Sequence, residues 1–207
     1  MYNEALELLE SVTGPEMAPL SGVMRCRYIA QEFRARKGLD INAITRRWLT
    51  TLEAACLPLP KSLYTIEPFI NWTRYLLDSG QYEAALAAVS RYEQGVKSLN
   101  YFYYWVVLKN IEAEALYALG QYDEAETIVD PLLARPEMAD YSEGLVAAAE
   151  LKANIRKQQS DHEQAYHWQQ IAIDSESSQN RLAATKQLAV NKAQATLRQA
   201  DENLRLL

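Results

Sequence analysis

The chain of 207 residues contains only two histidines, and both lie in the short run His162-Glu163-Gln164-Ala165-Tyr166-His167. A zinc-protease pattern needs its histidines four residues apart on one helix face, whereas a separation of five turns the second by about 140° from the first. We therefore expect no metal site here, and no sequence pattern indicates another cofactor.

Other signatures of catalysis are also missing. No segment matches Gly-x-x-x-x-Gly-Lys, Gly-x-Gly-x-x-Gly or Gly-x-Ser-x-Gly, so no phosphate-binding loop or nucleophile elbow is predicted. Carboxylates are plentiful, but their helical spacing is typical of solvated faces rather than of an acid and base pair. We expect no catalytic residues, and hence no enzyme activity, in this region.

The two cysteines, Cys26 and Cys56, lie in no CxxC or Cys/His spacing. We interpret them as separate small buried hydrophobes in a reducing compartment. The stretch 1–13 carries three glutamates and no basic residue, unlike a secretory signal. The longest apolar run, 101–108, is far shorter than the roughly 20 residues of a spanning helix. These features predict a cytoplasmic location without a membrane partner.

Composition favours an all-α fold. The chain has only seven glycines and seven prolines, too few for the many turns of a stranded protein. Its length is sufficient for a core that needs no disulfide or metal.

A repeat with a period of forty residues runs through the middle of the chain. Gly80-Gln81-Tyr82 recurs as Gly120-Gln121-Tyr122, and the next interval reaches Ser160-Asp161-His162. The same offset aligns three further sets of residues: Ala85, Ala125 and Ala165; Ile66, Val106 and Val146; and Thr73, Ala113 and Ala153.

Each repeat unit is predicted to be two helices around a tight turn. Gly80 and Gly120 would end the first helix in the left-handed conformation, which costs glycine no strain. Ser160 would adopt it at a cost on the order of 1 kcal/mol. The alanine of the second helix would let its partner, with a small facing residue, approach closely.

These residues resemble the tetratricopeptide repeat, and Leu119-Gly120-Gln121-Tyr122-Asp123-Glu124-Ala125 fits its pattern closely. The resemblance covers about residues 64–176. The sequence departs from the family pattern in two ways. The repeat interval is forty residues here, whereas the family has thirty-four. The proline that usually closes each unit is missing, although Pro131 and Pro136 lie near one unit end. The resemblance implies a right-handed α-solenoid of about ten helices.

The repeat divides the chain into an expected helical repeat domain, 1–176, and a C-terminal helix, 177–207. Residues 61–176 form three repeats. Residues 1–60 form N-terminal helices or a degenerate repeat, with helices expected over 2–12, 22–37 and 41–56.

The C-terminal helix is predicted to start after Ser175-Glu176-Ser177-Ser178. Its apolar stripe is interrupted by Lys186 and follows Leu182, Ala189, Ala193, Leu197, Ala200, Leu204 and Leu207. Three interpretations stay open: the helix pairs with a second copy, links to a further domain, or folds back as a cap.

Charge is separated along the sequence. Residues 25–47 hold seven basic and two acidic residues, whereas residues 110–150 hold ten acidic residues and one basic residue. Such segments steer charged partners, or they are ordinary solvated helix faces. The sequence pI of about 5.1 and the absence of basic motifs with interleaved aromatics predict no nucleic-acid partner.

Two sets of residues are candidates for binding. In the tetratricopeptide family the first helix of each pair lines the concave face, and the resemblance implies Arg74, Asn110, Glu114, Tyr117, Glu150, Asn154 and Lys157 as the corresponding residues here. Five successive aromatics, Tyr101 to Trp105, are expected mainly to pack in the core. An alternative is a pocket for a small molecule near Tyr103, Tyr104 and Trp105.

We therefore expect a non-catalytic interaction or regulatory module that binds a peptide or protein partner on its concave face. The arrangement of repeats followed by a long helix resembles the amino-terminal sensory region of bacterial signalling proteins with a diguanylate cyclase (GGDEF) or histidine-kinase output domain, the GGDEF type being favoured. The alternatives are a small-molecule sensor and the repeat domain of a transcription regulator.

Overall fold

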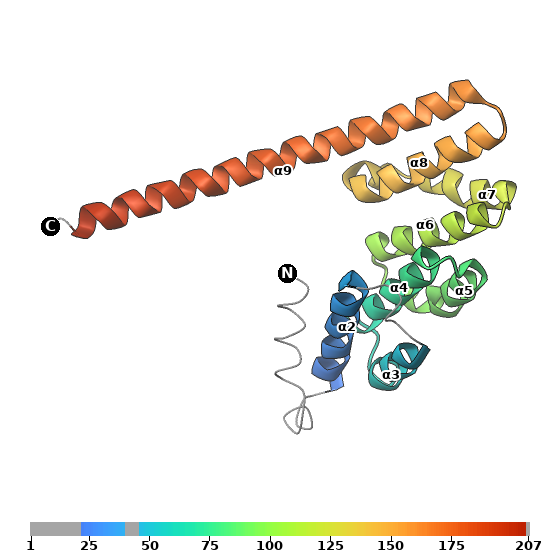
Figure 1. Cartoon of the computed structure of the whole chain (residues 1–207), viewed down its shortest axis with the longest axis horizontal. Helices are drawn as coiled ribbons and strands as arrows, with labels where there is room; N and C mark the ends of the chain where they lie inside the picture. The colour runs from blue at the N-terminus through green and yellow to red at the C-terminus, as the bar shows by residue number, and fades with distance from the viewer. Residues whose placement is uncertain (1–21, 40–45, 206–207) are drawn as a thin grey trace. The chain divides into compact units, whose positions relative to one another are not determined.

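The computed structural model describes residues 22–39 and 46–205, with side chains for 22–39 and 48–198 (Figure 1). These residues form eight α-helices and one 3-10 helix and contain no strand, which confirms the all-α class for this part of the chain. The helix expected over 2–12 and the start of that expected over 41–56 lie outside the described residues. No helix in the described part is long and apolar enough to cross a membrane.

The chain divides into two compact units, Met1–Leu132 and Leu133–Leu207. The helices of the first unit are α2 (Gly22–Leu39), α3 (Arg46–Cys56), α4 (Leu63–Asp78), α5 (Tyr82–Ser98), α6 (Phe102–Ala118) and, except for its last residue, α7 (Tyr122–Leu133). The second unit contains the 3-10 helix η3 (Pro136–Asp140), α8 (Ser142–Gln158) and α9 (His162–Arg205).

In the first unit, α4 packs against α2, α3, α5 and α6, and α5 packs against α6. The core between these helices is rich in aromatic residues. Phe33 from α2 meets Trp72 and Tyr75 from α4, and Phe69 stacks on Tyr92 from α5 with ring centroids 4.6 Å apart. Each of these five side chains is buried, and their burial supplies much of the hydrophobic stabilisation of this unit.

The predicted forty-residue turns are present in the structure. Gly80, Gly120 and Ser160 have φ of +73°, +78° and +63°. At each turn the next residue's N–H donates to the carbonyl five residues earlier at 2.9 Å, as from Gln81 to Leu76 and from Gln121 to Leu116. This bond is the mark of a Schellman cap, and it explains why three helices end forty residues apart.

The predicted packing alanines have different surroundings. Ala85 and Ala125 are fully buried, as are their expected partners Thr73 and Ala113, whereas Ala165 is half-buried. The third turn therefore shares the backbone geometry of the first two but not the burial of its alanine.

Two expectations from the sequence are wrong. Cys26 and Cys56 are not separate thiols but form a disulfide between α2 and α3, with Cα atoms 5.1 Å apart. No helix starts at 175–178, because α9 runs without interruption from His162 to Arg205. Residues 162–176, assigned to the third repeat, and the described part of 177–207 therefore belong to one helix. Serine lowers helix propensity only slightly, so the serines at 175–178 do not interrupt α9, and the Ser178 hydroxyl donates to the Asp174 carbonyl within the helix.

Candidate binding cavity

A cavity of about 570 Å³ opens in the first unit between α3, α4 and α5. Its volume lies within the range of about 300–1,000 Å³ that is usual for ligand sites. The lining residues are mostly apolar or aromatic: Leu49, Trp72, Tyr75, Leu76, Gln81, Ala84, Ala87, Ala88, Arg91 and Tyr92.

Helical periodicity places these side chains on the cavity wall. Tyr75 and Leu76 lie three and four residues after Trp72, so the three side chains share one face of α4. Ala84, Ala87 and Ala88 have the same spacing on α5. Because alanine has only a methyl group, α5 leaves space over the buried aromatic floor instead of filling it.

The polar edge of the cavity is organised around Glu53 of α3. Its carboxylate accepts a bond from Arg91 at 2.7 Å and one from the Tyr92 hydroxyl at 3.1 Å. Burial, followed by the nearby Glu53 charge, raises the pKa of the Tyr92 hydroxyl well above its ordinary value. Tyr92 is therefore a neutral donor at physiological pH, and the Arg91 side chain stays 54% exposed at the rim.

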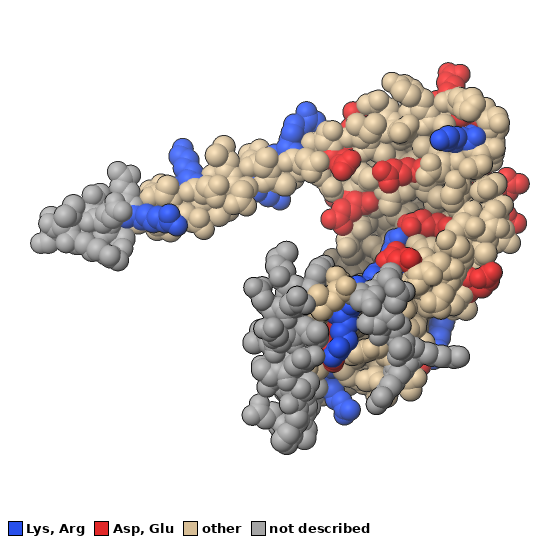
Figure 2. Space-filling view, in the orientation of Figure 1, with Lys and Arg blue, Asp and Glu red and all other residues tan. Residues whose placement is uncertain are grey.

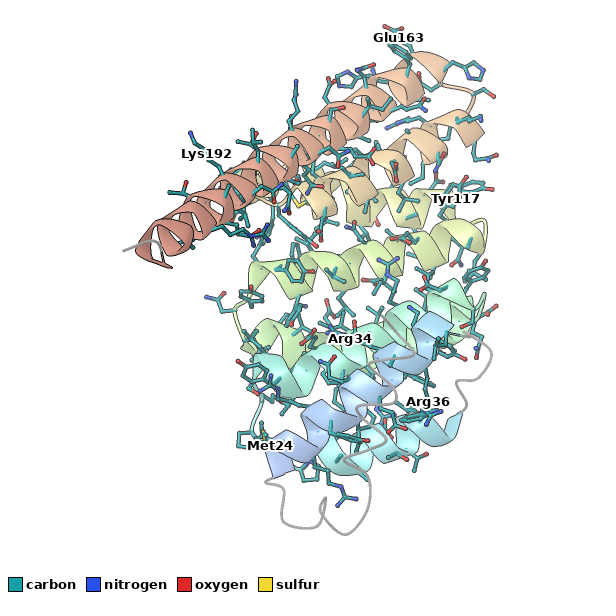
Figure 3. All side chains as sticks on the ribbon, turned by 60° about the vertical axis from the view of Figure 1, so that its left-hand side comes forward. Met24, Arg34, Arg36, Tyr117, Glu163 and Lys192 are labelled. Carbon is teal, nitrogen blue, oxygen red and sulfur yellow. A yellow bond between two sulfur atoms is a disulfide. The ribbon has the colours of Figure 1, made fainter. Side chains whose placement is uncertain are left out.

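The predicted concave-face residues fall into both units. In the first unit, the Arg74 guanidinium donates to the Glu114 carboxylate at 2.7 Å. Tyr117, labelled in Figure 3, is half-buried, and its ring lies beside the ring of Tyr122. Asn110 is only 3% exposed, which leaves little of it accessible to a partner. In the second unit, Glu150, Asn154 and Lys157 are exposed on α8.

The aromatic run at the start of α6 does not line this cavity. Tyr101 and Tyr103 are partly exposed, while Tyr104 and Trp105 pack against the core of the first unit. Burial, then the nearby Glu67 carboxylate, raises the pKa of Tyr104 above its ordinary value. Tyr104 thus belongs to a polar contact network in which Glu67 also pairs with Arg34 of α2.

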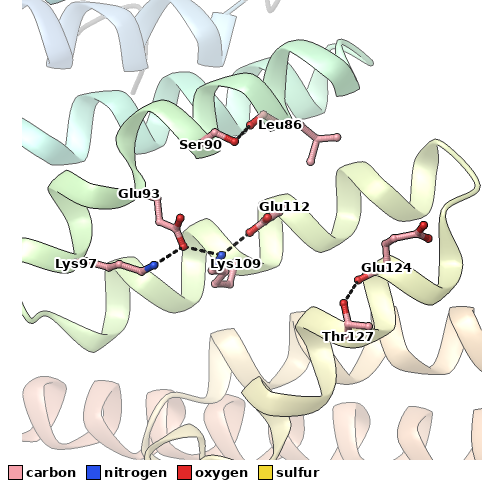
Figure 4. A network of polar contacts seen from close by, with 8 residues as sticks. All are labelled: Leu86, Ser90, Glu93, Lys97, Lys109, Glu112, Glu124 and Thr127. Atoms are coloured by element: carbon pink, nitrogen blue, oxygen red, sulfur yellow. Dashed lines mark hydrogen bonds and ion pairs between the residues drawn. The ribbon is translucent and has the colours of Figure 1, made fainter.

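A second network joins α5 to α6 (Figure 4). Glu93 accepts bonds from Lys97 at 3.0 Å and from Lys109 at 2.8 Å, and Lys109 also contacts Glu112 at 2.7 Å. The hydrogen bond from Lys109 is the largest cause of a lowered pKa of Glu93. Burial lowers the pKa of Lys109, but the bonds to Glu112 and Glu93 outweigh it and raise that pKa overall.

The positive segment predicted over 25–47 is partly neutralised within the fold. On α2, Arg34 pairs with Glu67, Arg36 with Glu32 at 3.0 Å, and Lys37 with Asp78 at 2.6 Å. The exposed charge of this segment is therefore smaller than the sequence indicates. The acidic segment is also partly paired, through Arg74 to Glu114 and Lys109 to Glu112.

The cavity was not predicted from the sequence, although its signal was present. The matching three- and four-residue spacings on 72–76 and 84–88 mark two helix faces, one of large and one of small side chains. The sequence patterns assigned Thr73 and Ala85 to close helix packing and made no prediction for these two faces. Within the described residues, no group of three or more His, Cys, Asp or Glu side chains is arranged to hold a metal ion.

Comparison of the chain with models of known families, with characterised proteins and with solved structures finds no match.

Proposed function

We propose that this protein is a non-catalytic interaction module that binds a peptide segment of a partner protein by inserting one apolar or aromatic side chain into the α3–α4–α5 cavity. The observation that carries this proposal is the lining itself: a buried aromatic floor, an alanine wall and hydrogen-bonding groups at the edge. Such lining is typical of a pocket that recognises an apolar anchor.

The open wall supports a peptide as the ligand. Ala84 and Ala87 are exposed, so the cavity is accessible along α5 and leaves room for a backbone beside the anchored side chain. Gln81 and Arg91 are also exposed and offer N–H donors to peptide carbonyls or to a carboxylate. Because Glu53 already neutralises part of the Arg91 charge, we expect the apolar anchor to dominate affinity.

A peptide-display selection tests this function. The full chain is the target, and Ala87→Trp, which fills the cavity from an exposed position, is the counter-target. Ala118→Trp, an exposed alanine on α6, is the matched control. We expect enriched peptides to share a large apolar residue, to bind the control as they bind the wild type, and to bind Ala87→Trp at least about tenfold more weakly. Failure to enrich any peptide, or equal binding to all three proteins, would contradict the proposal.

A small-molecule sensor is the second candidate, and the 570 Å³ volume favours it. N-acetyl-tryptophanamide serves as a free small-molecule probe. Its binding is monitored by the change in the NMR signal of the Trp72 indole. Binding of this probe as tightly as any selected peptide would favour the sensor over the interaction module.

The connection to a regulatory region of a bacterial signalling protein, or of a transcription regulator, rests on sequence resemblance alone. Disulfides persist mainly in oxidising compartments, so the Cys26–Cys56 pair weighs against the cytoplasmic location expected from the sequence.

A further inference from the structure

The last part of α9 exposes an apolar stripe beyond the region that α8 covers. Leu182, Val190 and Leu197 are 55%, 49% and 70% exposed, and every described side chain from 180 to 198 is exposed. Most helical stability in proteins comes from the packing of an amphipathic face, so burial of the stripe would stabilise the helix.

The stripe continues the face by which α9 packs on α8. Ala172, 3% exposed, lies on the α8 side, and the side chain of Gln179 hydrogen-bonds Ser142 at the start of α8. Val190 follows Ala172 by eighteen residues, and Leu197 follows Gln179 by the same number, which is five turns of α-helix. The exposed stripe is therefore the extension of an existing helix–helix interface past the end of α8.

Alanine content indicates that another helix covers this stripe. Positions 186, 190, 193, 197, 200 and 204, here called the α9 seam, follow a heptad spacing and carry Lys, Val, Ala, Leu, Ala and Leu. Small residues let two helix backbones approach closely, whereas they contribute little apolar area to a lipid surface.

The seam is complementary to itself in one orientation. In an antiparallel pair centred on residue 195, position 193 faces 197 of the other copy, 190 faces 200, and 186 faces 204. Each layer then joins a larger residue to alanine, or the Lys186 stem to leucine, so the layers interdigitate. A parallel pair would instead stack leucine on leucine, alanine on alanine and Lys186 on Lys186.

Charge placement agrees with this register. Between Glu176 and Asp201 the helix carries only basic charges, at Arg181, Lys186, Lys192 and Arg198. On the face shown in Figure 2, blue side chains without red ones follow the part of α9 beyond α8. Of these four residues only Lys186 lies in the seam, and the antiparallel register brings position 201 of the second copy, an aspartate, next to it.

We infer that α9 binds α9 of a second copy of this chain, antiparallel and centred on residue 195, so that each copy continues the other's α8. The interface is isologous, as a two-fold dimer requires. It begins where the contact of Gln179 with Ser142 ends, so α8 does not obstruct it.

Sedimentation equilibrium of the full chain tests the dimer. We expect a mass of twice 23.5 kDa for the wild type. Ala193→Glu buries an unpaired charge in the seam and should raise the dissociation constant by about tenfold or more. Ala195→Glu, two residues away on the opposite face of the helix, is the matched control and should leave the dimer intact. Because both positions are exposed in the single chain, neither variant should impair folding.

Disulfide cross-linking tests the register. In the antiparallel pair, position 194 lies beside 194 of the second copy, whereas position 187 lies beside 201. Gln194→Cys should therefore cross-link with itself on oxidation, and Gln187→Cys should not, with the wild type as background. A parallel pair would give both variants the same yield and would overturn the assigned orientation.

The dimer proposal would be overturned by a monomeric wild type, whether or not that monomer binds vesicles of phosphatidylserine and phosphatidylcholine. Equal dissociation constants for the Ala193→Glu and Ala195→Glu variants would overturn it as well. The peptide-binding cavity lies in the other unit, and its filling by Ala87→Trp should not alter the mass. Failure of one proposal is thus distinguishable from failure of the other.

Discussion

The Arg74 guanidinium and the Glu114 carboxylate, forty residues apart in the sequence, are joined between α4 and α6 by an ion pair of 2.7 Å. Each of the two residues lies six positions before the glycine that caps its helix. The helices α4 and α6 end in the same kind of cap, at Gly80 and Gly120. Residues forty apart therefore lie at the same distance from the ends of their helices.

This ion pair should contribute modestly to stability. The two side chains are 31% and 30% exposed, so solvent screens their attraction. In a double-mutant cycle of Arg74→Ala and Glu114→Ala, we expect a coupling free energy of roughly 0.5–1 kcal/mol, measured by urea unfolding. Arg91→Ala with Glu114→Ala provides a pair that shares no contact in the structure and should be additive.

The turn at Gly120 should resist substitution for backbone reasons alone. A Cβ added at this residue meets no atom within 4 Å, yet φ is +78°. Gly120→Val should therefore lower the free energy of unfolding by about 1 kcal/mol or more. The reverse change at the third turn, Ser160→Gly, should raise it by a similar amount because φ is +63° there. Unchanged melting temperatures for both variants would contradict this account.

The Glu93 network should make stability depend on acid pH. The pKa of Glu93 is lowered in the folded state, chiefly by Lys109, so the network stabilises the fold above the unfolded-state pKa of about 4.3. This contribution is lost as pH falls through the lower folded-state value. Glu93→Gln should reduce stability at neutral pH, by about 1 kcal/mol or less, and the difference from the wild type should shrink as the solution is acidified.

Acid-dependent urea unfolding measures this effect. Glu83→Gln, at an exposed position of the same helix, is the control for the loss of one carboxylate. A difference between Glu93→Gln and the wild type that stays constant down to about pH 3 would contradict the role given to Lys109.

The disulfide should stabilise the first unit through the loop it closes. Cys26 and Cys56 are thirty residues apart, and a loop of this size lowers unfolded-chain entropy by the equivalent of about 3–4 kcal/mol. Cys26→Ser with Cys56→Ser should lose roughly this stability, and dithiothreitol should destabilise the wild type but not the variant. Equal responses of the two proteins to reductant would refute the linkage.

The secondary structure was largely accessible from the sequence. The repeated Gly-Gln-Tyr triplets predicted helix ends that the structure places at Gly80 and Gly120, and Pro58 and Pro60 lie in the break between α3 and α4. These signals succeed because glycine and proline act on their own backbone torsions and need no distant partner. The serine run at 175–178 failed as a helix start because serine disfavours a helix too weakly to end one.

The candidate site was not accessible in the same way. The forty-residue interval aligned Arg74 with Glu114, but it did not show that they pair, nor that Asn110 is buried. The aromatic run at Tyr103 to Trp105 attracted attention, whereas the cavity lies over Trp72, Tyr75 and Tyr92.

The sequence by itself determined the all-α class of the described residues and the forty-residue turns, because both depend on torsional preference and local hydrogen bonding. Tertiary structure alone decided that Cys26 meets Cys56, that Glu53 reaches Arg91 and Tyr92, and that alanines on α5 leave a cavity. Those outcomes depend on how whole helices pack, and side chains that are far apart in sequence meet only when that packing is complete.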